Sequence, residues 1–434
     1  MRAPLVRAPS IALSPRAVNR VRLAAILGVL GPGLVSGFAD NDAGGITTYS
    51  VAGAKFGYDL LWVLLVSQIV LFFTQEVGAR LGLATGQGLA GLVRERYGVK
   101  WATFMISAML VANVGSIVAE FAGCGAAVEL LGYQSWIGAL LAAVVVVVLL
   151  TRGSYKWVQY IFVAIGAVVS IAYFVSALLA HPDWGTSATR LVIPHVTSDA
   201  AYWVMVVTTV GTTITPWGQA FIQSYVADKR LGPEDLVGER IDVGFGALLT
   251  NLIAAFIVVA SAVAVYTAKI PVDTGSPDAV KHIASALQPL AGDAAIYLFA
   301  FGLLAASFLG LGVVPLTSAY AACEAFGWET GVDWRMREAP AFYGLMIFFV
   351  IFAAIFVLLV PAGSLVQVIL YAQMINCILL PFVLVFVMRL SADKRLMGPL
   401  VSGRFLVTVG WLGTGLLVVL SMTLVATSVF GIGS

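Results

Sequence analysis

The sequence predicts an all-α integral membrane protein. Of its 434 residues, 60% are hydrophobic and only 11% are charged, whereas a soluble domain carries about 25% charged residues. Apolar runs of about 20 residues, the length that crosses a bilayer, recur along the whole chain. Backbone polar groups in lipid must be bonded within the protein, and the alternating segments typical of a membrane barrel do not occur, so we expect these runs to be helices.

We expect about eleven membrane-spanning helices, with boundaries good to a few residues. They cover roughly residues 23–53, 59–80, 101–131, 136–151, 157–180, 200–228, 241–268, 294–325, 341–360, 363–389 and 405–430. Residues 1–22 carry several arginines but are too long for a signal peptide, and no A-x-A cleavage site follows the apolar run. We therefore expect a cytoplasmic tail at 1–22, and a loop followed by the eleventh helix at 391–434.

Lysine and arginine predict the orientation of these helices. The tail and the loops after even-numbered helices hold most of them, including Arg80, Arg94 and Arg240, whereas the opposite side holds only Lys55, Arg190, Lys269 and Lys281. By the positive-inside rule, the N-terminus is cytoplasmic and the C-terminus is external in a multi-pass protein of a prokaryotic plasma membrane. The basic residues form no single patch, so we expect lipid and no nucleic acid as a partner. The oligomeric state is open, and a monomer is plausible.

Cysteine and histidine are absent from the positions where they would do chemistry. Cys124, Cys323 and Cys377 lie inside predicted helices at spacings that match no metal or haem motif, which is typical of small apolar filler. The three histidines fall in external loops. A membrane-embedded enzyme would need a nucleophile with a base, or an H-E-x-x-H pattern, and neither occurs. We therefore expect no enzymatic activity and no resident cofactor.

Two glycine- and proline-containing segments interrupt the first and sixth helices. One begins at Gly31-Pro32-Gly33 and continues to Asp40-Asn41-Asp42, and the other runs from Gly211 to Gln219. Inverted-repeat transporters of five plus five helices, the LeuT-like fold, have broken helices at these two positions. We therefore expect a ten-helix core at 23–390, with repeats at 23–180 and 200–390. Packing kinks are the alternative interpretation, but carboxylates at membrane depth are costly and favour a functional site.

Oxygen-bearing side chains at these breaks predict a site for a hard divalent cation. Asp42, Thr215 and Gln219 supply such oxygens, and Gln373 in the tenth helix is a further polar group at membrane depth. Asp40 is either a second acid of the site or faces a water-filled vestibule, and Asn41 either donates its carbonyl or caps a helix end. Oxygen donors without sulfur or imidazole suit Mg²⁺ or Mn²⁺, and Mg²⁺ keeps several waters when bound.

Several motifs occur together in the order and spacing of one family. They are Gln75-Glu76-Val77-Gly78-Ala79-Arg80-Leu81-Gly82 with Arg94-Glu95-Arg96-Tyr97, Ala119-Glu120-Phe121, and Pro182-Asp183-Trp184-Gly185. Through helices one to ten the chain resembles the NRAMP family of divalent metal transporters. The resemblance implies a LeuT-like fold that works by alternating access.

The site motifs differ from the usual family pattern. The family's Asp-Pro-Gly-Asn falls on Asp42-Ala43-Gly44-Gly45, so Gly45 takes the place of an asparagine ligand. The family's Met-Pro-His falls on Thr215-Pro216-Trp217, and Gln373 keeps the spacing of the family's helix-ten glutamine from Pro381. The resemblance thus implies that Asp42, Gly45, Thr215 and Gln373 are site positions. Loss of the methionine sulfur disfavours soft transition metals.

The family's proton-carrying positions are also depleted. They read Ile117, Trp217 and Ile222, and residues 339–388 contain no charged side chain. Glu120 remains, either as a transport-path acid or as a structural acid, and we expect it to lack titratable neighbours. The combination resembles the divergent NRAMP-related magnesium transporter branch.

The leading hypothesis is therefore a transporter of Mg²⁺ that also accepts Mn²⁺ without proton coupling. The alternative is a proton-coupled importer of Mn²⁺ or Fe²⁺. A sodium-coupled permease for an organic solute is a third possibility, but Asp40 beside Asp42 would repel the carboxylate that such proteins bind.

Overall fold

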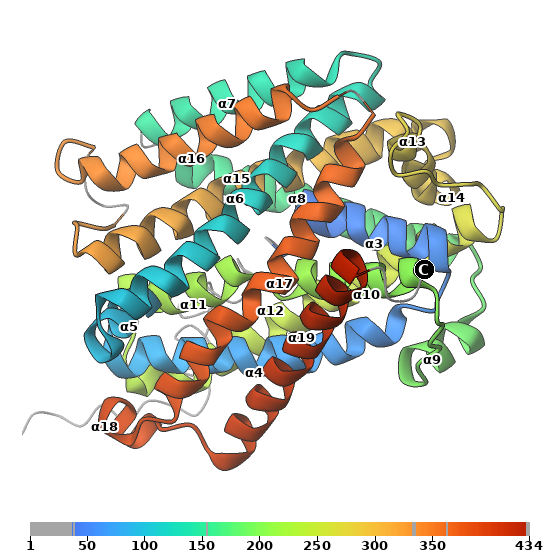
Figure 1. The fold of residues 1–434 in the computed structure, drawn as a ribbon. Coiled ribbons are helices and arrows are strands. Elements are labelled where there is room, and N and C mark those ends of the chain that lie inside the picture. The colour runs from blue at the N-terminus through green and yellow to red at the C-terminus, as the bar shows by residue number, and fades with distance from the viewer. Residues whose placement is uncertain (1–36, 38–39, 153–154, 332–335, 362, 431–434) are drawn as a thin grey trace, which may run out of the picture.

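The computed structural model describes residue 37 and residues 40–152, 155–331, 336–361 and 363–430. The regular structure of these ranges is helical (Figure 1). The long helices are α3 (Ala43–Phe56), α4 (Leu61–Thr85), α6 (Val99–Leu130), α7 (Ser135–Arg152), α8 (Tyr155–Leu179), α10 (Ala200–Thr213), α11 (Pro216–Asp228), α12 (Leu236–Ser261), α15 (Ala295–Phe326), α16 (Pro340–Leu358), α17 (Leu365–Ser391) and α19 (Arg404–Phe430). Short connecting helices are α5 (Leu89–Tyr97), α9 (Trp184–Val192), α13 (Ala279–Ala284), α14 (Gln288–Ala291) and α18 (Lys394–Met397).

The predicted all-α membrane fold is confirmed. Within the described residues, seven helices are long and apolar enough to cross a membrane, or up to eight if a pair that bends by 119° before α9 is one span. Helices α3, α10 and α11 are shorter because the first and sixth spans are broken, and α7 has only a short apolar stretch, Ser135–Leu150. The tail 1–22, the first half of the first span and Gly31-Pro32-Gly33 lie outside the described residues.

Two predicted boundaries are wrong by about one turn. The expected loop residue Arg80 lies buried inside α4, where its guanidinium pairs with Glu76 and donates to the Leu400 carbonyl oxygen at 3.3 Å. Arg240 lies inside α12, and its Nε donates to the same Glu76 carboxylate at 2.7 Å. Both helices are longer than hydropathy predicts because the buried Glu76 carboxylate pairs with Arg80 and with Arg240, so charged residues lie within the helices rather than in loops.

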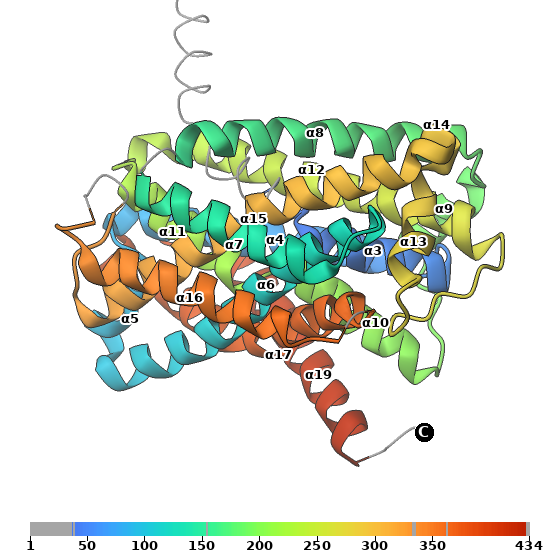
Figure 2. The same cartoon turned by 90° about the horizontal axis from the view of Figure 1, so that it is seen from above.

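Within the described residues, four of the five pairs of helices that correspond in the two predicted repeats pack against each other. Helix α3 contacts α10, α4 contacts α12, α6 contacts α15 and α7 contacts α16. Figure 1 shows α7 and α16 side by side along its upper edge, and Figure 2 shows α19 projecting away from the body. This pairing is the arrangement expected for an inverted repeat. The repeat boundaries 23–180 and 200–390 stay a prediction.

Two glycines allow broken-helix segments to lie directly against their neighbours. A Cβ atom on Gly211 of α10 would lie 2.0 Å from the carbonyl oxygen of Gln373 in α17. A Cβ atom on Gly53 of α3 would lie 2.2 Å from the carbonyl oxygen of Val258 in α12. Small residues at such contacts let helix backbones approach closely in a membrane protein.

Candidate metal-binding site

The first half of the site is the start of α3. The Asp42 backbone is extended and its Oδ1 accepts a hydrogen bond from the Gly45 N–H at 2.8 Å, which ends the interruption and caps the helix. Gly45 contributes no side chain, and a Cβ atom there would lie 2.7 Å from the Asp40 carbonyl oxygen. Asp42 is only 3% exposed, so a carboxylate is held at the break away from water.

Glu120 of α6 reaches the same helix start. Its Oε2 accepts a hydrogen bond from the Ala43 N–H at 3.2 Å, and its carboxyl group is in hydrogen-bonding contact with that of Asp42. Gly310 of α15 leaves room for it, since a Cβ atom there would lie 2.5 Å from Glu120 Cδ. The expectation that Glu120 lacks titratable neighbours is therefore wrong. Two carboxyl groups in contact need a shared proton or a cation to offset their repulsion.

The second half of the site is the start of α11. Ile214 and Thr215 have extended backbones between α10 and α11, so the sixth span is broken where the sequence predicts. Thr215 Oγ1 accepts from the Gly218 N–H at 3.2 Å, and Pro216 occupies the first turn, where its missing N–H costs nothing. One turn further, Gln219 is 1% exposed, and neither polar atom of its amide has a partner among the described residues.

Gln373 of α17 brings an amide to the Asp42 carboxylate. A Cβ atom on Gly44 would lie 1.9 Å from Gln373 Nε2 and 3.0 Å from Asp42 Oδ1, so both groups lie close to the space that a side chain at this glycine would occupy. Gln373 Oε1 accepts from Asn376 Nδ2 at 2.8 Å, and Asn376 in turn bonds Ser116. Sequence reasoning missed Asn376 and Ser116. The signal for Asn376 was its place three residues after Gln373, one turn along the same helix face.

Asp40 and Asn41 have different surroundings. Both Asp40 carboxylate oxygens are buried and have no partner in the described structure. Asn41 Nδ2 donates to the carbonyl oxygens of Gly37 and Thr250, each at 3.4 Å, so this side chain fastens the break to α12. Its Oδ1 is buried without a partner. Asp40 and the Asn41 carbonyl oxygen thus both remain candidate ligands, while the Asn41 amide nitrogen tethers the break.

The chemistry of the site follows from its unsatisfied oxygens. The described residues contain no group of three His, Cys, Asp or Glu side chains arranged to hold a metal ion. The polar atoms here belong instead to carboxylates, carboxamides and a hydroxyl from α3, α6, α11 and α17. A buried polar atom without a partner costs about 1–3 kcal/mol, so the site favours a cation or water that satisfies several oxygens at once. Hard cations with part of their hydration shell fit such donors.

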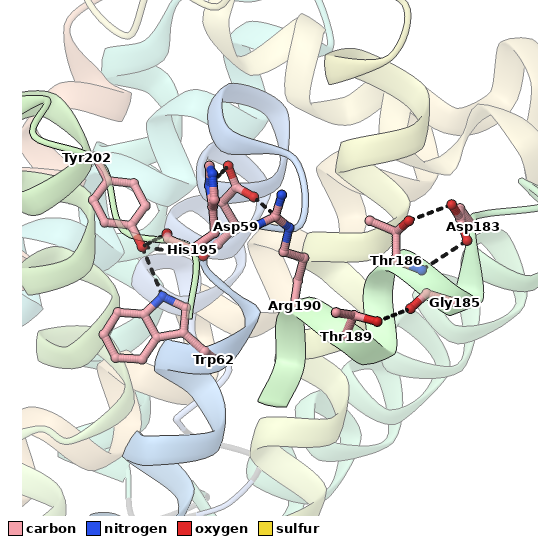
Figure 3. A network of polar contacts seen from close by, with 9 residues as sticks. All are labelled: Asp59, Trp62, Asp183, Gly185, Thr186, Thr189, Arg190, His195 and Tyr202. Atoms are coloured by element: carbon pink, nitrogen blue, oxygen red, sulfur yellow. Dashed lines mark hydrogen bonds and ion pairs between the residues drawn. The ribbon is translucent and has the colours of Figure 1, made fainter. Parts of the chain in front are cut away.

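A polar network at the other end of α10 holds that helix and α9 in place (Figure 3). Asp59, before α4, pairs with Arg190 of α9 at 3.3 Å and with His195 at 3.0 Å. Tyr202 of α10 donates to the His195 carbonyl oxygen at 2.7 Å and accepts from Trp62 Nε1 at 2.9 Å. Two stretches distant in sequence, 59–62 and 190–202, therefore meet beside the start of α10.

The same figure shows how α9 begins. Asp183 accepts hydrogen bonds from the Thr186 hydroxyl at 2.6 Å and from the Thr186 N–H at 3.0 Å. These bonds, led by that of the hydroxyl, hold the pKa of Asp183 below its usual range. The carboxylate is therefore the form that caps this helix.

Comparison with known proteins gives the family. A profile of the Nramp family, described as natural resistance-associated macrophage protein-like, matches residues 33–427. The divalent metal cation transporter MntH of Deinococcus radiodurans is 29% identical over 410 residues, which cover 92% of this chain and 88% of that protein. MntH 1 of Pseudomonas aeruginosa is 28% identical over 412 residues, which cover 91% and 90%.

Solved structures share the fold at lower sequence identity. A mutant of the Eremococcus coleocola manganese transporter aligns with a TM-score of 0.75 at 18% identity, and the match covers 99% of this chain and 91% of that one. MhsT in complex with L-phenylalanine aligns with a TM-score of 0.61 at 14% identity, covering 91% and 97%. The predicted LeuT-like fold is thereby confirmed. Since the family profile spans nearly the whole described structure, this chain belongs to the Nramp family.

Proposed function

We propose that this chain transports divalent metal cations across a membrane and binds them between the starts of α3 and α11. The observation that carries the proposal is the buried Asp42 carboxylate at a helix break, with Glu120 and the Gln373 amide around it. Family membership and the printed names of the relatives, divalent metal cation transporters, support the same function. They also favour a metal over the organic solute considered from the sequence.

In this proposal Asp42 is the central anionic ligand. Thr215 has a lone pair left after accepting from Gly218, and the amides of Gln219 and Gln373 can rotate to present their carbonyl oxygens. Waters complete the coordination shell, because few protein oxygens converge and hard divalent ions lose water reluctantly. Gly45 has no side chain to offer, so the family's asparagine ligand is replaced by water or by Asp40.

The proposed substrate is Mn²⁺, which fits both the oxygen donors of the site and the names of the relatives. The relatives' names concern divalent metals, and a solved protein of this fold is named a manganese transporter. These names favour Mn²⁺, the alternative from the sequence, over Mg²⁺. Mg²⁺ remains a second candidate on one observation, the Thr215 hydroxyl at the start of α11 where the family has a sulfur ligand. The absence of proton coupling, the plasma membrane orientation and a monomeric state remain predictions.

The test is metal uptake into proteoliposomes that contain a metal-quenched dye. Wild-type protein should admit Mn²⁺, and Asp42→Ala should reduce uptake to the level of empty liposomes because the central charge is lost. Asp293→Asn, an exposed acid in the connection before α15, is the matched control and should transport normally. Near-normal uptake by a monodisperse Asp42→Ala protein would remove Asp42 from the site. Loss of Mn²⁺ uptake in excess Mg²⁺ would then show that Mg²⁺ competes for the same site.

A further inference from the structure

A second polar cavity lies between α5, α11 and α15. Its volume is about 340 Å³. Side chains with oxygen atoms line it, namely Gln87, Ser224, Asp228, Tyr320, Glu324 and Thr330. Among the described residues that line it, none is a lysine, arginine or histidine. Two carboxylates therefore face a space large enough for an ion that keeps its water.

Glu324 presents one oxygen atom that the protein does not satisfy. Its Oε1 accepts from the Ser224 hydroxyl at 3.0 Å, and its carboxylate also accepts from backbone N–H groups of Ala90 and Gly91 at the start of α5. Its Oε2 is buried and has no partner in the described structure. Gly88 permits this approach, because a Cβ atom there would lie 1.9 Å from Glu324 Oε1. Glu324 thus caps α5 with part of its carboxylate and leaves the rest for a ligand.

The nearest lysine in the sequence is engaged elsewhere. Lys229 follows Asp228 directly, but its Nζ lies 4.9 Å from the centroid of the Tyr225 ring. That distance is typical of a cation–π contact. Lys229 therefore does not line the cavity, and both charged side chains among its described lining residues are acids.

A smaller cavity extends this space along α11 toward the central site. Its volume is about 40 Å³, and it shares Ser224, Asp228 and Tyr320 with the larger one. Thr317 and Phe221 lie deeper in it. The Phe221 ring lies 6.4 Å from that of Trp217, which is fully buried two residues after Thr215. The two cavities thus follow α11 from its end at Asp228 back to an aromatic pair next to the central site.

We propose that the larger cavity is a second, weaker binding site for hydrated divalent cations, with Glu324 and Asp228 as its anionic groups. It rests on the proposed function, because a transported ion must pass from the central site to the membrane surface. Trp217 and Phe221 separate the two sites, so an ion leaving Asp42 would pass this aromatic pair and be received by Glu324. Waters bridge the cation to Ser224 and Tyr320.

The test measures bound Mn²⁺ directly, from the loss of the electron paramagnetic resonance signal of free aqueous Mn²⁺. The protein is purified as full-length chain in lipid nanodiscs, and Asp42→Ala removes the central site. One weakly bound Mn²⁺ per chain should remain in Asp42→Ala. Adding Glu324→Gln or Asp228→Asn should weaken that binding at least tenfold. Glu324→Gln keeps an oxygen that can accept from α5, so the cap is retained while the charge is lost.

Glu95→Gln is the matched control, because this exposed acid lies on α5 but does not line the cavity. It should leave Mn²⁺ binding unchanged. The proposal is overturned if Asp42→Ala binds no Mn²⁺. It is also overturned if neither Glu324→Gln nor Asp228→Asn weakens the binding of the remaining Mn²⁺. A purely structural Glu324 would instead lower the melting temperature without changing Mn²⁺ binding. Failure of wild-type uptake would reject the proposed function alone, since the binding measurement does not require transport.

Discussion

At the scale of single residues, Asp42 caps a helix and, in the proposed function, also binds the cation. One oxygen caps α3 through Gly45, and the carboxyl group also faces Glu120 and the Gln373 amide. A capping carboxylate keeps lone pairs for a cation, so it can fix the helix start and bind metal together. In the proposed site, Asp42 thus contributes the geometry of the helix start as well as charge.

Thr215 sets the preference for hard metals in this interpretation. Thr215→Met would place a soft sulfur at the start of α11, and the ratio of Cd²⁺ to Mg²⁺ affinity should rise on the order of tenfold. Calorimetric titration with each ion measures it. Thr215→Ser keeps the hydroxyl and should keep the wild-type ratio. An unchanged ratio in Thr215→Met would place the selectivity in other residues or in the size of the site.

At the scale of helices, α10 is held between α17 and α3. Gly211 lets its backbone lie against α17, and the Thr213 hydroxyl bonds the Tyr49 hydroxyl of α3 at 2.9 Å. Its other end meets the network of Asp59, Arg190 and His195 (Figure 3). Both ends of α10 are therefore fixed. Movement of this half-helix would have to break the contacts with α17 and α3 at one end and those with the Asp59 network at the other.

Gly211→Ala should destabilise the protein by about 1–3 kcal/mol, because the new methyl group overlaps the Gln373 carbonyl oxygen and forces α10 from α17. Thermal unfolding in detergent measures the loss. Gly344→Ala in α16 is the control, since among the described residues no atom outside its own helical turns lies within 4 Å of the added Cβ. Equal melting temperatures for the two variants would show that α10 can shift without cost.

Helix α9 should loosen in acid. The lowered pKa of Asp183 means that its contribution to the cap is fully present above the unfolded value of about 3.9 and is lost as pH falls through the lower folded value. Amide exchange in α9, corrected for the intrinsic rate, should rise below about pH 4. Asp183→Ala should show fast exchange at every pH. A flat wild-type profile would mean that Asp59 and Arg190 hold α9 without its cap.

At the scale of the whole molecule, the sequence predicts what depends on local composition. Apolar runs give the spans to within about a turn, and the residues at 42 and 215 mark both breaks because glycine, proline and polar side chains interrupt those runs. Contacts between distant segments leave no such local signal. The Glu120–Asp42 contact and the role of Asn376 depend on how α6 and α17 pack against α3. Paired charges within a helix, such as Glu76 with Arg80, lower the local hydropathy, so a hydropathy pattern places the helix end too early.

The membrane potential should drive uptake. A divalent ion gains about 4.6 kcal/mol through 100 mV, twice the 2.3 kcal/mol of one charge. Mn²⁺ influx into liposomes with a valinomycin-clamped potential should therefore increase as the interior becomes negative. The sequence-based expectation is that an internal pH dye stays flat. Acidification that follows Mn²⁺ and disappears in Glu120→Gln would establish the proton-coupled alternative, which the contact between Glu120 and Asp42 makes physically possible.

In the proposed site, a cation bound by the oxygens around Asp42, several of which lack partners among the described residues, becomes part of the folding equilibrium. An ion that binds only the folded chain stabilises it by mass action, by about 2.7 kcal/mol at a concentration one hundred times its Kd. Heat can therefore identify substrates without any transport assay. Mn²⁺, Mg²⁺, Ca²⁺ and Cd²⁺ should each raise the melting temperature in proportion to the logarithm of their affinity, and the order of those shifts is the ion selectivity of the site.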